Sequence, residues 1–311
     1  QVAHALHVVG IVRDRQLVIL DTATLKPRLE INTPEPLSAV SLSPDARLVT
    51  GLDGTPALRV WDAVDGRLLH TRRLDVSREG CGLVTAPDGH RVALDCLDGK
   101  VFIADIRSGE LLKVDDRGPY NLAFLNGRGE LVIGGPSGRV DLWEPGATPR
   151  LIHEYPYAVH HIAPVPTGRK VVFSYDRVVD VWDAERDTLT PLAGHTLQVS
   201  AVGISADGSR LVTSGRDNVV RIFALETGAL LHTITPSALM ANLLALSADG
   251  EVLAGSAHDG QILLWDLLGG PETLREPRLL LGHSSKVGVM RFAADARSLL
   301  SIDNEGRAIR W

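Results

Sequence analysis

One position recurs along the whole chain at intervals of 39 to 46 residues, and it constrains the fold more than any other feature. All five tryptophans of the 311-residue chain occupy it, and an acidic residue usually follows. The occurrences are Leu20, Trp61, Ala104, Trp143, Trp182, Phe223, Trp265 and Trp311. Self-similarity at this period is typical of proteins built from stacked structural repeats. The sequence therefore predicts eight similar units.

The unit from Gly194 to Ile234 shows the internal pattern most clearly. It contains four short stretches in which apolar residues alternate with small or polar ones, at 199–205, 210–214, 219–224 and 229–234. Turns that contain Gly or Asp separate them, which predicts an antiparallel meander of four strands. A lone four-stranded sheet has two faces to bury, so it needs similar sheets on either side. No helical periodicity or βαβ pattern competes with this interpretation.

Short motifs recur at matching places in the units. An Asp precedes the recurring aromatic position by six residues in five units, at Asp14, Asp98, Asp176, Asp217 and Asp259. With its pieces GH, SADG, SGRDN, VWD and LWD, the chain resembles the WD40-repeat family. The resemblance covers nearly the whole chain. It implies an all-β β-propeller in which each four-stranded antiparallel unit is one blade.

The resemblance implies a single propeller domain over residues 1–311. The predicted blades are approximately 1–36, 37–78, 79–117, 118–156, 157–194, 195–237, 238–282 and 283–311. Eight recurring positions favour eight blades. A seven-bladed ring made by units two to eight is the alternative, because the first unit shows three clear strands and the last stops after its third.

In the family, a His, a Ser or Thr, an Asp and a Trp of one blade form a buried hydrogen-bonded set. The resemblance implies that His195, Ser214 and Asp217 belong to such a set, in which Phe223 replaces the Trp. In the last unit, His283 and Trp311 are present with Glu305 in the Asp position. We interpret these side chains as parts of the scaffold.

The sequence offers no motif for catalysis. It contains no G-x-S-x-G elbow and no phosphate-binding loop. His160 and His161 are adjacent on a predicted strand, so their rings point to opposite faces and cannot bind one metal ion. We therefore expect no enzyme activity, no cofactor and no metal. A propeller hydrolase or lactonase with a site in its central channel is the alternative.

Charge and cysteine content set the expected partners and compartment. The net charge of −6, with acidic and basic residues interspersed, makes nucleic acid an unexpected partner. No apolar run is long enough for a transmembrane helix, so we expect no membrane partner. Cys81 and Cys96 fall on neighbouring strands of one unit, and we expect two unbonded, buried small side chains. Two cysteines form no disulfide framework, which favours a reducing compartment and a cytoplasmic location.

Aromatic and arginine side chains gather in loops predicted to share one face of the propeller. Tyr and Arg are enriched at binding hot spots, although these rings could simply cap the blades. The candidate partner-binding residues are Tyr120, Tyr155, Tyr157, His160, Tyr175, Arg177 and Arg216.

These features predict a non-catalytic scaffold or sensor module that binds a peptide or protein partner. Only five of the 32 basic residues are Lys, which suggests a bacterial genome. The start at Gln1 and the end at Trp311 suggest a piece of a larger regulatory protein fused to an effector domain. A purely structural self-assembly platform is a further alternative.

Overall fold

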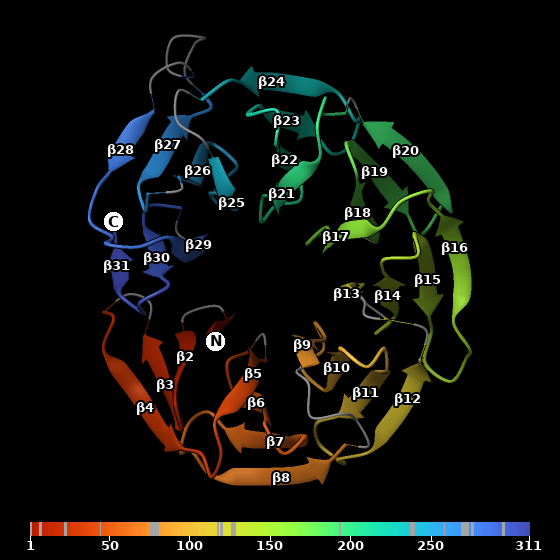
Figure 1. Cartoon of the computed structure of the whole chain (residues 1–311), viewed down its shortest axis with the longest axis vertical. Helices are drawn as coiled ribbons and strands as arrows, with labels where there is room; N and C mark the ends of the chain where they lie inside the picture. The colour runs from red at the N-terminus through yellow and green to blue at the C-terminus, as the bar shows by residue number, and fades with distance from the viewer. Residues whose placement is uncertain are drawn as a thin grey trace. The chain divides into compact units, whose positions relative to one another are not determined.

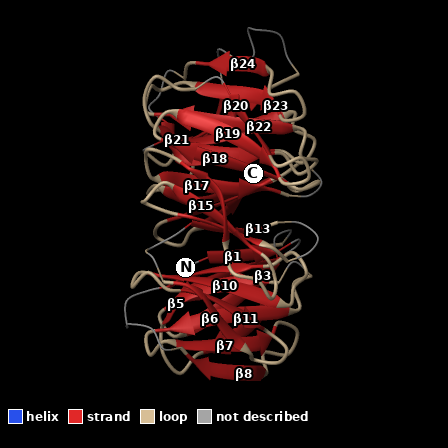
Figure 2. Cartoon of the chain, turned by 90° about the vertical axis from the view of Figure 1, so that its right-hand side faces the viewer, coloured by secondary structure: helices blue, strands red, loops and turns tan. Residues whose placement is uncertain are grey.

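The computed structural model consists of strands and loops, and no helix occurs among the residues that it describes (Figure 2). It describes the whole chain except residues 1, 6–7, 22–23, 44, 75–80, 117, 119–120, 126–128, 193, 237–239, 258, 269–273, 275–276 and 294–295. In this described part, the strands form seven four-stranded sheets and one three-stranded sheet. In each sheet, strands that follow one another in sequence are neighbours, as predicted for a meander.

Residues 1–159 form one compact unit, here called unit 1. Its four sheets (Figure 1) are β1 (Val2–Ala5), β2 (Val8–Arg13), β3 (Gln16–Asp21), β4 (Pro27–Asn32); β5 (Leu37–Leu42), β6 (Leu48–Asp53), β7 (Ala57–Asp62), β8 (Leu68–Arg73); β9 (Cys81–Thr85), β10 (Arg91–Cys96), β11 (Val101–Asp105), β12 (Leu111–Asp115); and β13 (Asn121–Phe124), β14 (Leu131–Gly134), β15 (Arg139–Trp143), β16 (Arg150–Glu154).

Residues 160–311 form the second compact unit, unit 2. Its sheets are β17 (Val159–Pro164), β18 (Lys170–Tyr175), β19 (Val178–Asp183), β20 (Thr188–Leu192); β21 (Val199–Ile204), β22 (Arg210–Gly215), β23 (Val220–Ala224), β24 (Leu230–Ile234); β25 (Met240–Leu246), β26 (Val252–Ala257), β27 (Ile262–Asp266), β28 (Arg278–Leu280); and β29 (Val287–Phe292), β30 (Leu299–Asp303), β31 (Ala308–Arg310).

The eight sheets confirm the eight predicted repeat units. The first unit has the fourth strand that the sequence did not suggest, because β1 pairs with β2 in antiparallel register. Five of the six recurring aromatic side chains lie in the core, among them Trp182 at 1% exposure and Phe223 and Trp265 at 0%, whereas Trp311 is half-buried. Burying a large apolar side chain stabilises the fold by about 1.5–3 kcal/mol. This contribution explains why the position repeats.

The hydrophobic core lies between consecutive sheets of each unit. In unit 2, Val172 and Val181 of one sheet pack in the same cluster as Leu211 and Phe223 of the next. In unit 1, Leu17 and Ile19 of β3 share a cluster with residues of β5 to β7. Each sheet therefore buries its faces against its neighbours, as the sequence pattern predicts.

The recurring first turn of the repeat has a local explanation. In the SPDA turn, Ser43 Oγ donates to Asp45 Oδ1 at 2.6 Å, and in the SADG turn Ser205 Oγ donates to Asp207 Oδ1 at 2.6 Å. The Asp also accepts a backbone N–H two residues later, from Arg47 and from Ser209. Such side-chain bonds to a local amide favour a tight turn.

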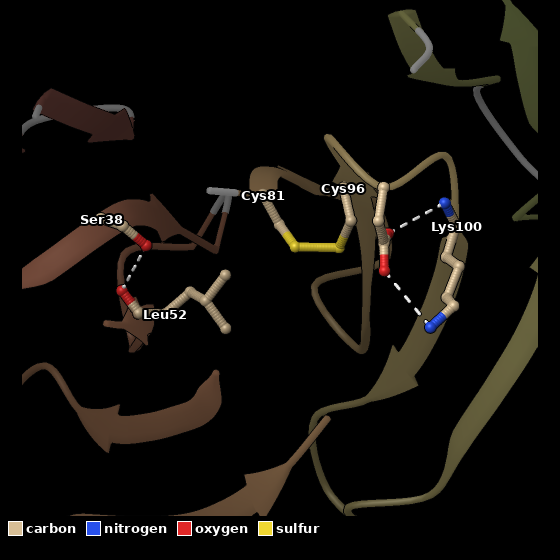
Figure 3. The surroundings of a disulfide bond; sticks show 6 residues. Ser38, Leu52, Cys81, Cys96 and Lys100 are labelled. Atoms are coloured by element: carbon tan, nitrogen blue, oxygen red, sulfur yellow. Dashed lines mark hydrogen bonds and ion pairs between the residues drawn. A yellow bond between two sulfur atoms is a disulfide. The ribbon is translucent and has the colours of Figure 1, made fainter. Parts of the chain in front are cut away.

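A disulfide joins Cys81 and Cys96, so the expectation of two unbonded cysteines is wrong (Figure 3). Cys81 begins β9, Cys96 ends β10, and the two residues lie directly opposite each other in the register. Directly opposed residues on antiparallel strands have Cβ atoms about 4.5–5.5 Å apart, close to the separation that a disulfide needs. A count of cysteines takes no account of this register. The cysteines therefore no longer support a reducing compartment.

Candidate protein-interaction surface

Three connections meet at one end of the neighbouring sheets β17–β20 and β21–β24 in unit 2 (Figure 1). They are the β18–β19 turn, the β20–β21 loop and the β22–β23 turn. The backbone N–H of His195 donates to the carbonyl of Arg177 at 2.9 Å, and that of Arg216 donates to the carbonyl of Gln198 at 2.8 Å. These bonds hold the three connections together, so their side chains project from a fixed base.

Two arginines dominate the exposed side chains of this end. Arg177 and Arg216 are both exposed, and within the described part of the chain neither forms an ion pair. Between them in sequence, Leu197 is 55% exposed on the connecting loop, and Gln198 is half-buried. We call Arg177, Leu197, Gln198 and Arg216 the arginine surface. Both arginines are among the predicted candidate residues, whereas Leu197 and Gln198 are not, because they follow Gly194-His195 without a sequence pattern of their own.

The predicted candidates His160 and Tyr175 lie on the same sheet as Arg177. His160 is exposed, and its Nε2 lies 2.9 Å from Nε2 of Gln198. The next residue, His161, is half-buried, with Nδ1 2.7 Å from Ser174 Oγ, so the two rings face different partners as predicted. Tyr175 is half-buried, and burial together with the charge of Asp180 raises the pKa of its phenol.

Tyr155 and Tyr157 belong to unit 1 and differ sharply in exposure. Tyr155 is 3% exposed, and its ring contacts that of His153 edge-on at 4.5 Å between centroids. Its backbone N–H donates to the carbonyl of Gly138 at 2.8 Å. Gly138 has φ of +80°, and a Cβ there would clash with the carbonyl oxygen of Tyr155. Tyr155 is therefore part of the packed loop, while Tyr157, at 58% exposure, presents its ring to solvent. Tyr120 lies outside the described residues.

His195 and Asp217 form a buried polar network in the sixth sheet. His195 Nδ1 lies 2.9 Å from Asp217 Oδ1, and Arg221 Nη1 lies 3.3 Å from Asp217 Oδ2. The hydroxyl partner of His195 Nε2 is Thr213, at 2.9 Å, so the prediction of Ser214 is wrong. In a strand, adjacent side chains point to opposite faces, and Ser214 therefore faces away from the ring. Ser214 instead lies 3.1 Å from Ser200 Oγ.

Burial and hydrogen bonds shift the pKa values of both groups in this network. Burial lowers the pKa of His195 by more than its bond to Asp217 raises it. Burial would raise the pKa of Asp217, but bonds from His195 and from the Thr196 and Val219 amides lower it to about 2.

The last sheet contains the complete buried set. His283 Nε2 lies 2.6 Å from Ser301 Oγ, and Trp311 Nε1 donates to the same hydroxyl at 2.8 Å. The carboxylate is that of Asp303, 3.1 Å from His283 Nδ1, so the prediction of Glu305 is wrong. Glu305 was predicted because it lies six residues before Trp311, and this spacing does not identify the carboxylate in the last sheet. Asp303 ends β30, and its Oδ1 accepts the backbone N–H groups of Glu305 and Arg307.

The seventh sheet, β25–β28, contains Trp265 but not the hydrogen-bonded set seen in the last sheet. Trp265 Nε1 and Ser256 Oγ are both buried, and neither has a partner in the described structure. In register, Gly255 opposes Leu263 as Ser301 opposes Ile309, so a glycine occupies the place of the hydroxyl. Among the described residues, the indole of Trp265 is therefore held by packing.

Two kinds of feature are absent from the residues that the structure describes. No three His, Cys, Asp or Glu side chains lie together in a way that could hold a metal ion. No helix with the length and hydropathy needed to cross a membrane is found in the part of the chain that the structure describes.

Comparison with solved structures places the whole chain in one fold. The crystal structure of the computationally designed Ika8 protein matches all of this chain and 94% of its own, with a TM-score of 0.79 and 22% identity. Together with the eight antiparallel meanders, this likeness defines a β-propeller protein. The family described as "WD domain, G-beta repeat" matches residues 186–223 and 232–266. These two matches show WD40 repeats within residues 186–266 of the chain.

Curated relatives have the same repeats in longer chains. Drosophila melanogaster protein groucho is 36% identical over 187 residues, which is 58% of this chain and 25% of groucho. Mus musculus cilia- and flagella-associated protein 52 is 23% identical over 82% of this chain and 42% of its own. Arabidopsis thaliana autophagy-related protein 16 is 29% identical over 42% of this chain and 26% of its own. The chain thus spans less than half of each relative. WD40-repeat proteins typically act as scaffolds for protein interactions.

Proposed function

We propose that the chain is a non-catalytic interaction module that binds a protein or peptide partner through the arginine surface of unit 2. The observation that carries this proposal is the pair of exposed arginines, Arg177 and Arg216, which form no ion pair within the described residues. A guanidinium has five N–H donors in a planar fork, which matches a carboxylate or a phosphate. An acidic or phosphorylated segment is therefore the partner chemistry that this surface favours.

The surroundings of the arginines support a binding role. Leu197 exposes an apolar side chain on the loop between them, and the loop backbone is fixed by hydrogen bonds to both turns. Interfaces commonly combine an apolar contact with Arg anchors, and a fixed base reduces the entropy lost on binding. His160 and Tyr175 of the same sheet extend this surface. Tyr157 of unit 1 is a separate exposed candidate.

We further propose that the module is part of a longer regulatory protein of bacterial origin. The short share of each relative that the chain spans supports a multidomain setting. The predominance of Arg over Lys supports the bacterial origin. A cytoplasmic location stays a prediction, with the absence of an apolar segment as its support.

The test is charge reversal at the arginine surface. The double variant R177E/R216E should lose capture of the partner from an extract of the source cells. It should also weaken binding of the purified partner by about a hundredfold or more, because two favourable contacts become repulsive. The unfolding temperature should not change, because both side chains are exposed.

The matched control is R28E/R150E, which reverses two other exposed arginines that lie in unit 1 and form no ion pair with any residue that the structure describes. This variant should bind the partner normally. Retention of the partner by R177E/R216E, or equal loss in both variants, would show that the arginine surface is not the binding site.

A further inference from the structure

The neighbouring sheets β17–β20 and β21–β24 enclose a cavity of about 340 Å³ at the end opposite to the arginine surface. The β17–β18 and β19–β20 turns form one wall, and the β21–β22 and β23–β24 turns form the other. Val165 and Leu225, which are 2% and 4% exposed, contribute apolar side chains. Because successive turns of a meander alternate between its two ends, this cavity lies at the end away from the arginine surface.

Two other places in the chain show what fills the equivalent space. Arg210 begins β22, and its Nη1 donates to the carbonyl of Gly250, in the first turn of the next sheet, at 2.6 Å. Arg91 begins β10 and donates in the same way to Gly129 of the next sheet, at 3.2 Å. The side chain of Arg210 also packs closely on Gly250, since a Cβ there would lie 3.1 Å from Arg210 Cδ. At both places a guanidinium bridges two sheets by binding a glycine carbonyl.

At the cavity this bridge is missing. Lys170 begins β18 and opposes Asp183, just as Arg91 opposes Asp105 and Arg210 opposes Ala224. Its ammonium forms neither a hydrogen bond nor an ion pair within the described residues. The corresponding turn glycine is Gly208, and among the described contacts its carbonyl accepts no hydrogen bond. Thr167 instead joins the two turns, with Oγ1 donating to the carbonyl of Asp207 at 3.2 Å.

The charges around the cavity favour a cation. Arg186 is paired with Asp183 at 2.8 Å, and Asp207 accepts bonds from Ser205 and Ser209. Arg169 has interactions of its own. The exposed side chains of Glu185 and Glu226 also line the cavity, and neither forms an ion pair among the described residues. The lining therefore contains four carboxylates, those of Asp183, Glu185, Asp207 and Glu226, and three cationic side chains, those of Arg169, Lys170 and Arg186, which leaves one negative charge in excess.

We propose that this cavity binds an arginine side chain presented by a partner protein. The guanidinium donates to the Gly208 carbonyl and pairs with Glu185 and Glu226, while its aliphatic part packs on Val165 and Leu225. Within this chain, Arg91 and Arg210 each donate a hydrogen bond to a glycine carbonyl of the next sheet. The proposed contact is the same hydrogen bond, formed between two molecules. It is independent of the arginine surface, because it lies at the other end of the sheets and selects the opposite charge.

The experiment uses N-acetyl-arginine N-methylamide as the probe and follows backbone amide resonances of the whole chain by NMR. We expect millimolar binding, with shifts centred on Gly168, Gly208 and Ser209. The isosteric N-acetyl-citrulline N-methylamide has no charge and should bind about tenfold more weakly or not measurably.

Two variants test the geometry. K170R supplies the missing bridge from within the chain, so it should weaken probe binding about tenfold or more without loss of thermal stability. E226Q removes an exposed carboxylate and should weaken binding about twofold to fivefold with the fold unchanged. If K170R does not fold, E226Q and the citrulline probe still decide the question.

Equal binding of the arginine and citrulline probes would overturn the proposal, as would unchanged binding to both variants. Shifts centred on the arginine surface would do the same. The R177E/R216E variant should bind the probe like the unmodified chain, so that failure of this proposal and failure of the proposed function can be told apart.

Discussion

At the scale of single residues, two buried serines in neighbouring sheets contribute very differently to stability. Ser301 Oγ accepts the indole N–H of Trp311 and bonds His283 Nε2, whereas Ser256 Oγ is buried with no partner among the described residues. Both side chains are 0% exposed. The sequence shows a serine at each site. Only the strand register and the side-chain rotamers determine which hydroxyl forms hydrogen bonds.

The two serines therefore give a matched prediction. S301A leaves the indole N–H of Trp311 without an acceptor and Nε2 of His283 without its hydroxyl partner, and should cost about 1–3 kcal/mol of unfolding free energy. S256A removes a buried hydroxyl that has no hydrogen bond among the described residues, and it should be neutral or stabilising. Urea unfolding of the two variants measures both values. Similar losses in both would contradict this assignment of hydrogen bonds.

The lowered pKa of Asp217 predicts a pH-dependent contribution to stability. Its folded pKa of about 2 lies below the ordinary value of 3.8, so the folded state binds this proton less readily than the unfolded state. The stabilisation is complete above pH 3.8 and is lost as the pH falls towards 2, with a size on the order of 2 kcal/mol. The difference in unfolding free energy between the unmodified chain and D217N should therefore shrink across this range. A difference that does not vary with pH would refute the prediction.

Protonation of His195 affects stability in a different pH range. Its pKa lies below 6.5 in the folded state because burial disfavours the charged ring. The unfolded state therefore takes up this proton first, and stability should begin to fall as the pH drops below 6.5. The D217N comparison between pH 7 and pH 5 reports this group rather than the carboxylate.

At the scale of elements, strong local signals predicted the strands well. The expected strands 199–205, 210–214, 219–224 and 229–234 end within one residue of those in the structure. Alternating side chains and Gly/Asp turns determine these boundaries locally. β1 was missed because it is only four residues long, and its pairing with β2 is not a local property.

Loops were harder to predict than strands, and the candidate site consists of loops. The sequence grouped Tyr155 with Tyr157 because both look like exposed aromatic anchors. Tyr155 is buried by a close approach to Gly138, which depends on packing between segments that are far apart in sequence. Arg177 and Arg216 are exposed, because charged turn residues rarely become buried without a partner. Charge was thus a better guide to exposure here than aromatic character.

The β9–β10 hairpin gives the prediction at this scale. The disulfide closes a loop with a sequence separation of 15 residues, for which the loss of chain entropy in the unfolded state stabilises the fold by about 3 kcal/mol. Dithiothreitol should lower the unfolding free energy of the unmodified chain by about this amount and leave C81A/C96A unaffected. Two reactive thiols on alkylation in denaturant without reductant would show that the bond is absent.

At the scale of the whole molecule, stability arises between neighbouring sheets. Each main hydrophobic cluster contains residues of two consecutive sheets within a unit. The free energy of unfolding is then close to a sum over repeats and their nearest-neighbour interfaces. The repeat period alone was enough to predict this organisation, since it requires only that similar sheets stack. The partner surface could not follow from the period, because it depends on side chains that differ between repeats.

The overall charge gives a prediction for the intact chain. With a net charge of −6 and its basic residues dispersed, the molecule should not be retained on heparin at physiological salt. R177E/R216E should elute in the same position, which would separate a specific arginine surface from general anion binding. Strong retention of the unmodified chain, lost in the double variant, would instead indicate a polyanion site.

The placement of the tryptophans also allows the unfolding of individual sheets to be followed by intrinsic fluorescence. Trp61 and Trp143 lie in unit 1, and Trp182, Trp265 and Trp311 in unit 2, with no two in the same sheet. Phe223 occupies the recurring aromatic position and its side chain is 0% exposed, so a phenyl ring can be buried there. Replacing four tryptophans by Phe at a time would leave one indole per molecule. The emission maxima of five such variants would then resolve whether the sheets melt together or one after another.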